Sequence, residues 1–363
     1  MTKIFGIVNL HYDEELASLT SNRPLASVAF LGRYTFVDLA LSNFANSGVE
    51  ELGVLIQNKP RSLLKHFGFE HNEWLRNSKT GKMILMYNES QNNNPKLNHA
   101  FNNLVENAWA LKDSKAEYVA IAPAHIVMRL DFREMVKTLK RKKADIVVGF
   151  CDPIKVKEPI YYSFSEKGEL KGVGEEPTKH LCIHVFLLKR QVLQEMIKNN
   201  FNNANKIYDL NWFNATKDKY RVVGYKYRGF ISFVESIQDY YNLSMELLKP
   251  RNTSKLFVKD WPIYTRTYNT PPTYYGHNVE VKGSLIANGG FIKGTVINSI
   301  LGRDVTVGEG AVITDSILFS RCNVEAGAKL TKVICDKSAQ ITKDKVIKGT
   351  SKNPFIVKQE EIV

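Results

Sequence analysis

The stretch SILGRDVTVGEGAVITDSILFSRCNVEAGAKLTKVI, residues 299–334, carries a repeat that decides the fold of the C-terminal part of the chain. Within it, single apolar residues recur at steps near six, at Leu301, Val307, Ile313, Leu318, Val324 and Leu330. Longer repeats return after 15, 17 and 16 residues, as Ser284-Leu-Ile, Ser299-Ile-Leu, Ser316-Ile-Leu and Lys332-Val-Ile. Such steps, with glycines at the turns, predict a parallel β-helix of three short strands per coil whose apolar residues point inward and stack. A meandering antiparallel sheet is the alternative, and it leaves the long-range repeat as a coincidence.

The chain before this repeat alternates short apolar runs with helix-like patterns. The runs that predict buried strands are 4–8, 54–56, 83–86, 118–121, 146–148 and 184–188. Helical patterns cover 35–47, 97–112, 131–143 and 238–248, and Pro250 stops the last of them. Alternating strands and helices favour a mostly parallel α/β sheet. We therefore expect an α/β domain over 1–250, a linker over 251–278 and a β-helix over 279–363.

The length and charge agree with a folded protein of two domains. At 363 residues the chain exceeds the size at which one hydrophobic core stops growing, about 250–300 residues. A net charge of +13 favours anionic partners such as phosphorylated small molecules, nucleic acid or a membrane surface. No nucleic-acid motif accompanies the charge, no run reaches the roughly 18 apolar residues of a spanning helix, and the N-terminus turns acidic too early for a signal peptide. The sequence predicts a soluble cytoplasmic protein that binds neither nucleic acid nor membrane.

Other features have ordinary structural interpretations. The four cysteines form no CxxC pair, which argues against a disulfide framework or a zinc site. Three of them, Cys182, Cys322 and Cys335, fall in apolar runs and are expected to be buried thiols. His66 and His71 lack the spacing of a zinc-binding helix, so no metal site is assigned to them. The basic residues of 137–143 end a predicted helix, where cations suit the helix dipole.

Two segments near the N-terminus resemble a known family. These are RPLASVAFLGRYTFVD (23–38) and LSNFANSG (41–48), which are similar to the start of bacterial ADP-glucose pyrophosphorylases. That family makes ADP-glucose from ATP and glucose 1-phosphate. The resemblance implies a Rossmann-like, GT-A-like nucleotidyltransferase domain followed by a left-handed β-helix, and it covers nearly the whole chain.

Active members of this family carry groups for the triphosphate that are missing here. Their Gly-rich loop resembles GGxGTRL, whereas this chain has NLHYDEEL (9–16), with Asp13, Glu14 and Glu15 in place of Gly, Thr and Arg. Each carboxylate would repel a phosphate charge by about 4 kcal/mol at about 4 Å and an effective dielectric constant near 20. In the next motif, RAKPA, Arg23 is kept and the lysine is Leu25.

The family positions for Mg²⁺ and for the sugar phosphate have changed as well. Pro123 or Ala124 replaces the Asp of a GDH turn, and the second metal Asp, in a motif like YWxDVGT, falls at Phe233. Mg²⁺ is held by carboxylates, so both ligands are lost. The lysine of an FxEKP motif becomes Glu176. Asp131 and Glu175 remain as remnants of the substrate pocket.

The loss of five functional groups on an intact scaffold narrows the resemblance to GlgD-type subunits. Subunits of that type look regulatory and non-catalytic, and they pair with a catalytic GlgC-type subunit, here expected in a heterotetramer. The resemblance implies a regulatory role in glycogen biosynthesis, no cofactor in this chain and Mg²⁺ only in the catalytic partner. Arg23 and Arg33 are the candidates for binding an anionic effector, such as a sugar phosphate or phosphoglycerate.

Two other functions are left open by the residues. The preserved fold, Arg23, Asp131 and Glu175 are compatible with a divergent but active sugar-1-phosphate nucleotidyltransferase. An acyltransferase of the β-helix type would rely on a histidine between coils, but the only histidine after residue 250 is His277, which precedes the repeat. His125, beside the missing metal Asp, is interpreted as a structural residue.

Overall fold

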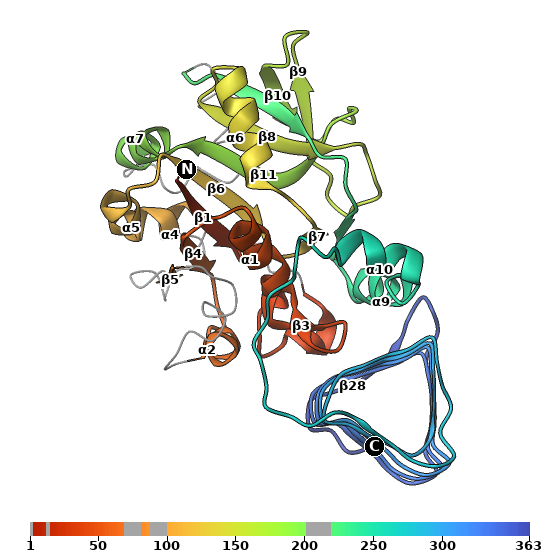
Figure 1. Cartoon of the computed structure of the whole chain (residues 1–363). Coiled ribbons are helices and arrows are strands. Elements are labelled where there is room, and N and C mark those ends of the chain that lie inside the picture. The colour runs from red at the N-terminus through yellow and green to blue at the C-terminus, as the bar shows by residue number, and fades with distance from the viewer. Residues whose placement is uncertain (1–2, 12–14, 69–80, 88–99, 201–218) are drawn as a thin grey trace.

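The computed structural model describes residues 3–11, 15–68, 81–87, 100–200 and 219–363. Within these ranges the chain forms an α/β domain followed by a β-helix, and helices α9 (Ile237–Glu246) and α10 (Pro250–Leu256) lie between them (Figure 1). The predicted fold class is confirmed. No helix in the described ranges is long and apolar enough to cross a membrane.

A nine-stranded sheet forms the centre of the α/β domain. Its order is β10-β9-β11-β6-β1-β4-β5, with β8 beside β11 and β12 beside β8. The strands are β1 (Ile4–Asn9), β4 (Glu51–Ile56), β5 (Lys82–Tyr87), β6 (Tyr118–Pro123), β8 (Ile146–Cys151), β9 (Tyr161–Phe164), β10 (Leu170–Gly174), β11 (Leu181–Lys189) and β12 (Val222–Lys226). The central strands β6, β1, β4 and β5 are parallel, whereas β11 runs antiparallel to β6 and β8. The parallel register places the ends of β1 and β6 side by side, with Asn9 opposite Pro123.

Helices cover both faces of this sheet. One core contains α1 (Phe36–Asn46), α2 (Arg61–Phe67) and α6 (Phe132–Arg141). The other contains α4 (Ala100–Glu106), α5 (Ala108–Asp113) and α7 (Arg190–Asn200). Neighbouring strand residues point to opposite faces, so Val8 of β1 lies in the first core and Ile7 in the second. Thr35 and Asp38 form a capping box that fixes the start of α1.

The predicted helix over 97–112 is two helices instead of one. Residues 97–99 lie outside the described ranges, and the rest divides into α4 and α5 at Asn107. The Asn107 amide donates to the carbonyl oxygens of Tyr87 (2.8 Å) and Asn103 (2.9 Å). An asparagine side chain that bonds to nearby backbone competes with helix continuation, which explains the break.

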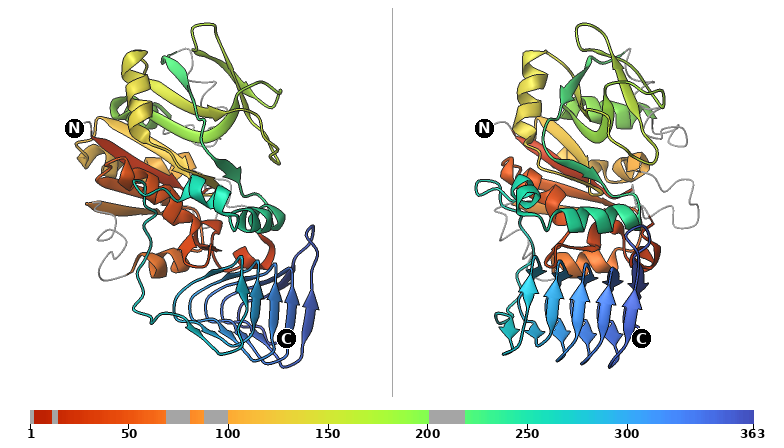
Figure 2. Two further views of the ribbon diagram at one scale, coloured as in Figure 1. Left: turned by 45° about the vertical axis from the view of Figure 1, so that its right-hand side comes forward. Right: turned by 90° about the vertical axis from the view of Figure 1, so that its right-hand side faces the viewer.

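The C-terminal domain is a three-sided parallel β-helix, triangular along its axis (Figure 1) and a regular stack of coils from the side (Figure 2). One side consists of β14 (Tyr274–Tyr275), β17 (Phe291–Ile292), β20 (Thr306–Val307), β23 (Asn323–Val324) and β26 (Gln340–Ile341). The second consists of β15 (Val281–Lys282), β18 (Thr295–Ile297), β21 (Val312–Thr314), β24 (Lys329–Thr331) and β27 (Val346–Lys348). The third consists of β16 (Leu285–Ile286), β19 (Ile300–Leu301), β22 (Ile317–Leu318), β25 (Val333–Cys335) and β28 (Phe355–Val357). The six predicted inward positions between Leu301 and Leu330 are buried in one interior core, as expected.

The last copy of the triplet repeat is shifted by one residue from the predicted alignment. Ile317 pairs with Ile334 and not with Val333, so that interval is 17 residues long, as is the interval from Ile300 to Ile317. Val333 takes the buried position of Ser316, and its N–H donates to the Ser316 Oγ at 3.1 Å. The serine at the start of each earlier triplet therefore corresponds to Val333.

The third side of the β-helix faces the α/β domain. Its strand residues alternate, so Leu301 points into the coil while Ile300, like Ile317 and Ile334 above it, points out. These isoleucines are at most 2% exposed. They pack with Leu247, which follows α9, and with Leu256 of α10. The two domains therefore share one continuous apolar core.

The expected linker over 251–278 is partly wrong. Residues 252–254, which fall inside the expected linker, lie in α10, and the first β-helix strand, β14, already begins at Tyr274. Pro250 does not end a helix here, because it occupies the first turn of α10, where its fixed φ and missing N–H are tolerated. The four cysteines are buried and unpaired, as predicted for three of them.

Candidate functional site

The structure brings together three of the positions at which the sequence predicts lost family groups, namely Leu25, Ala124 and Phe233. Leu25 lies in a short 3-10 helix and is 1% exposed, and Ala124 follows β6 and is also buried. Phe233 lies in β13 (Ile231–Phe233), which pairs with β7 (Ile126–Met128), so its ring stands 6.4 Å from that of His125. The cavity that the described residues leave here measures only about 10 Å³. It is lined by Asn9, Leu10, Pro24, Leu25, Ala26, Ala124 and His125.

His125 fills the space beside the missing metal ligand without supplying a charge. Its side chain is buried, and its ring lies 6.0 Å from that of His184. Burial, and then the neighbouring His184, lower the pKa of His125 to about 3. The imidazole is therefore neutral at physiological pH and packs as a core side chain.

The other predicted pocket residues lie apart from this small cavity. Asp131 caps α6, accepts from the Arg133 N–H at 2.9 Å and pairs with the Arg133 side chain at 2.7 Å. Glu175 and Glu176 are exposed, and so is Glu15. Asp13 and Glu14 lie outside the described residues. Among the described residues, Asp131, Glu175, Glu176 and Glu15 therefore do not form one cluster of carboxylates with the small cavity.

The positions that would hold Mg²⁺ do not fit the ion. They present Pro123, Ala124 and Phe233, none of which has an oxygen-bearing side chain. Among the residues that the structure describes, no group of three His, Cys, Asp or Glu side chains could hold a metal. The absence of a cofactor from this chain stays a prediction.

A second cavity, which we call the cationic cleft, lies between the α/β domain and the β-helix. It has a volume of about 230 Å³. Its basic lining residues come from both domains and are Arg23, Arg33, Lys65, His66, Arg266, Arg303, Arg321 and Lys337. Asp304 is the only acidic residue of that lining. A concentration of like charge at a domain boundary is the expected form of a site for a small anion.

Arg23, a predicted anion ligand, is held by the protein itself. Its guanidinium is buried, forms an ion pair with Asp336 of the β-helix, and donates from Nε to the Leu19 carbonyl at 2.7 Å. It also stacks 6.0 Å from the Phe319 ring centre. Arg23 therefore borders the cleft mainly as a fixed link between the two domains.

Arg33 and Arg303 stand at the wall of the cleft. Arg33 lies over the Tyr34 ring and makes no ion pair among the described residues. Arg303 stacks 4.3 Å from the Tyr268 ring centre and donates to the Arg33 carbonyl at 3.2 Å. Its buried Nε has no hydrogen-bond acceptor in the described part of the chain, and burial lowers its pKa. An anion in the cleft would supply both charge and acceptor.

Asp38 anchors the histidine of the cleft. The fully buried Asp38 carboxylate accepts from the Thr265 hydroxyl at 2.7 Å and lies 2.7 Å from His66 Nε2. Thr265 belongs to the segment that leads into the β-helix. The same carboxylate therefore caps α1, orients His66 and ties the two domains together.

Lys337 makes the cleft sensitive to pH. Burial and then the neighbouring Arg23, Arg321 and Lys65 lower its pKa to about 8, while Asp336 acts in the opposite direction. Lys337 is thus cationic below about pH 8 and neutral above it. A bound anion would stabilise the charged form, so binding near this pH should take up a proton.

We expect the affinity for sulfate to fall as the pH rises from 7 to 9. Sulfate is the chosen probe because its own charge is constant over this range, so the change reports on the protein. Titration calorimetry in buffers of different ionisation enthalpy would measure the affinity and the proton uptake. Lys337→Met should bind sulfate more weakly and lose most of the pH dependence. A pH dependence unchanged in this variant would contradict the assignment to Lys337.

Sequence reasoning found only part of the cleft. It singled out Arg23 and Arg33, but not Lys65, Arg266, Arg303, Arg321 or Lys337. These residues are scattered over the chain and form no local motif. Only the docking of the β-helix on the α/β domain brings them to one place.

Comparisons with known proteins agree with this architecture. A family model described as nucleotidyl transferase matches residues 14–248, and one described as GlmU-like, C-terminal hexapeptide matches residues 272–359. The second match fits a left-handed β-helix with three parallel sides.

Curated proteins that are similar to this chain include three from bacteria. It is 27% identical, over 98% of its length and 96% of the relative's, to the glycogen biosynthesis protein GlgD of Bacillus subtilis (strain 168). It is 29% identical to the glucose-1-phosphate adenylyltransferase of Clostridium botulinum, over 83% of this chain and 81% of that one. The corresponding Clostridium perfringens protein is 26% identical over 85% and 81%. Since the first family model covers more than half of the chain, this protein belongs to the nucleotidyl transferase family.

Proposed function

We propose that this chain is a regulatory subunit of glucose-1-phosphate adenylyltransferase in glycogen biosynthesis. It acts on a catalytic GlgC-type partner, in a heterotetramer, and takes little or no part in catalysis itself. The observation that carries this proposal is a contrast between two cavities. The one that the described residues form beside Leu25 and Ala124, two of the family's catalytic positions, measures about 10 Å³, whereas the one at the domain boundary measures about 230 Å³ and is cationic.

The small cavity supports a non-catalytic role. Pockets for small molecules usually measure about 300–1,000 Å³, whereas the cavity that the described residues form beside Leu25 and Ala124 measures about 10 Å³. That volume holds about one water molecule. Leu25, which lines this cavity, is 1% exposed and belongs to the shared core. A nucleoside triphosphate would in addition find no carboxylate pair for its magnesium at Pro123, Ala124 and Phe233.

The cationic cleft supports a regulatory role. Its lining comes from both domains, so an anion bound there contacts both at once. A sugar phosphate or a phosphoglycerate has the charge and size for such a site. If the anion favours one arrangement of the subunits, it changes the partner's activity through a coupling of about 1–3 kcal/mol, the usual range of allosteric effects.

The test compares the purified chain, its catalytic partner and the mixture of both. With ATP, glucose 1-phosphate and Mg²⁺, the chain alone should release no measurable pyrophosphate. Added to the partner, it should change the partner's kcat or its response to phosphorylated effectors. Co-purification of the two chains would measure the complex directly.

Two results would speak against the proposal. Partner kinetics that stay the same at saturating amounts of this chain would exclude the regulatory role. Robust pyrophosphate release by the chain alone would establish the alternative, a divergent but active sugar-1-phosphate nucleotidyltransferase. A preparation of the Arg141→Glu variant, changed at an exposed residue far from both cavities, serves as the control for purification artefacts.

A further inference from the structure

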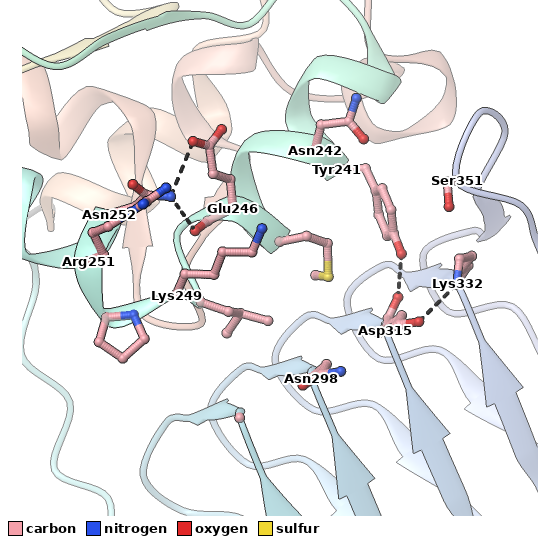
Figure 3. Close-up of a pocket in the computed structure, with 14 residues that line it drawn as sticks. Tyr241, Asn242, Glu246, Lys249, Arg251, Asn252, Asn298, Asp315, Lys332 and Ser351 are labelled. Carbon is pink, nitrogen blue, oxygen red and sulfur yellow. Dashed lines mark hydrogen bonds and ion pairs between the residues drawn. The ribbon is translucent and has the colours of Figure 1, made fainter.

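A third cavity lies between helices α9 and α10 and one corner of the β-helix (Figure 3). Its volume is about 690 Å³, within the range of about 300–1,000 Å³ that is typical of small-molecule sites. It shares no lining residue with the cationic cleft. Next to it, the domain interface is tightly packed, because Tyr240, Leu247 and Ile300 are fully buried. The space is therefore a local hollow at the rim of a dense interface.

The floor of this cavity is one column of corner residues. Gly283, Asn298, Asp315 and Lys332 come from successive coils, and all four have a positive φ between 46° and 59°. The shared conformation directs their side chains to the same side of the β-helix. Gly283 leaves room for its neighbour, since a Cβ atom there would stand 2.6 Å from the Asn298 amide oxygen. The Asn298 amide consequently occupies an open place in the floor (Figure 3).

Two charged residues of the floor are already satisfied. The Asp315 carboxylate pairs with the Lys332 ammonium at 2.8 Å, and the Asp315 carbonyl accepts from the Tyr241 hydroxyl at 2.6 Å. Burial raises the pKa of Tyr241 to about 12, so its hydroxyl stays protonated and remains a donor. This trio joins α9 to the β-helix and closes one end of the cavity.

The groups that remain available are two cations, Lys249 and Arg251, one carboxylate and amides. Lys249 is exposed, makes no ion pair among the described residues, and directs its ammonium into the cavity (Figure 3). Glu246, on the same α9–α10 wall as Lys249, accepts from the Asn252 amide at 3.2 Å (Figure 3). Met245 and Leu248 add apolar surface between these polar groups. With Asp315 and Lys332 paired, the two remaining cations exceed the remaining carboxylate by one positive charge. A net positive charge, amide donors and acceptors and a small apolar patch are what a hydroxylated anion requires.

We propose that this cavity is a second ligand site, specific for a hydroxylated organic anion such as a sugar phosphate or a sugar acid. The Lys249 ammonium binds the anionic group, and the Asn298 amide bonds to hydroxyl groups. Met245 contacts the carbon skeleton. The site does not depend on the proposed regulatory function, because it shares no residue with the cleft on which that function rests.

Methyl resonances of methionine provide a direct test. The chain has seven methionines, and Met245 is the one that lines this cavity, whereas the described lining of the cationic cleft has none. In protein labelled at the methionine methyl groups, glucose 6-phosphate or gluconate should shift the Met245 signal in a saturable way. Met245→Leu assigns that signal. Inorganic phosphate lacks the carbon skeleton with its hydroxyl groups, and glucose lacks the anionic group. Each should therefore bind at least about tenfold more weakly.

Substitutions then assign the contacts. Lys249→Glu should weaken binding at the Met245 signal by at least about tenfold. The matched control, Lys255→Glu, makes the same charge change at an exposed position of α10 outside the cavity and should bind like the wild type. Asn298→Gly should weaken binding without disturbing the fold, because glycine already occupies this corner at Gly283. A Met245 signal that does not move at about 10 mM of either hydroxylated probe, or equal affinity in Lys249→Glu, would overturn the proposal.

Discussion

Asp336→Ala is expected to lower the free energy of unfolding by about 3–5 kcal/mol, because it leaves the Arg23 guanidinium buried without its carboxylate. The side chains of this pair are only 6% and 1% exposed. Removing one partner of a buried pair is more damaging than removing both, since the remaining charge cannot return to water. Urea unfolding, followed by circular dichroism, measures the loss.

Two controls separate this effect from a general sensitivity of the protein. The double variant Arg23→Met with Asp336→Leu should recover a large part of the lost stability, because it removes both charges and restores apolar volume. Glu134→Gln breaks the exposed pair with Lys137 and should change the stability by less than about 1 kcal/mol. If Asp336→Ala is as stable as the Glu134→Gln variant, the link between the domains does not depend on this ion pair.

Arg303→Glu is expected to reduce the affinity of the cationic cleft for sulfate or phosphoglycerate by at least about 100-fold. The substitution removes a cation and introduces a carboxylate at the wall of the cleft. The interaction energy between two unit charges is about 4 kcal/mol at about 4 Å and an effective dielectric constant near 20, before screening by salt. Titration calorimetry at low ionic strength gives the affinity. In the complex with a catalytic partner, the same variant should abolish the response to effectors that depends on this chain.

Arg303 is half-buried, so the Arg303→Glu variant could lose binding because it does not fold. A second variant at an exposed position separates these two outcomes. Arg321→Glu makes the same charge change at an exposed position on the rim of the cleft and should also weaken binding, by a smaller factor. Arg141→Glu, at the exposed end of α6, is the matched control with no expected effect. Sulfate affinity that is equal in Arg321→Glu, Arg141→Glu and the wild type would show that the cleft is not the anion site.

The sequence predicted the architecture because its pattern is local and periodic. The steps near six between Leu301 and Leu330 located the interior of the β-helix correctly. The periodicity does not explain why each triplet has two adjacent apolar residues. The reason is a tertiary contact, since Ile300, Ile317 and Ile334 point outward and are covered by the α/β domain.

The candidate sites were harder to predict, for a related reason. The sequence could single out Leu25, Ala124 and Phe233 because family motifs fix where the functional groups are expected. The cationic cleft has no motif, since Lys65, Arg303 and Lys337 are neighbours only after the domains dock. Arg23 was recognised as a basic residue of the right region, yet its partner Asp336 lies more than 300 residues away in sequence.

The regular stacking of the β-helix coils fixes the distance between cations in the cleft. Arg303 and Lys337 stand two coils apart at the same corner, with Ser320 between them. Neighbouring strands are about 4.8 Å apart, so the backbones that carry these two cations are separated by about 10 Å. Moving a charge to Ser320 would shorten that separation by one strand spacing while the backbone stays in place. The choice of the coil that carries the cation therefore sets the distance between the two cations, and with it the length of the anion that can bind both.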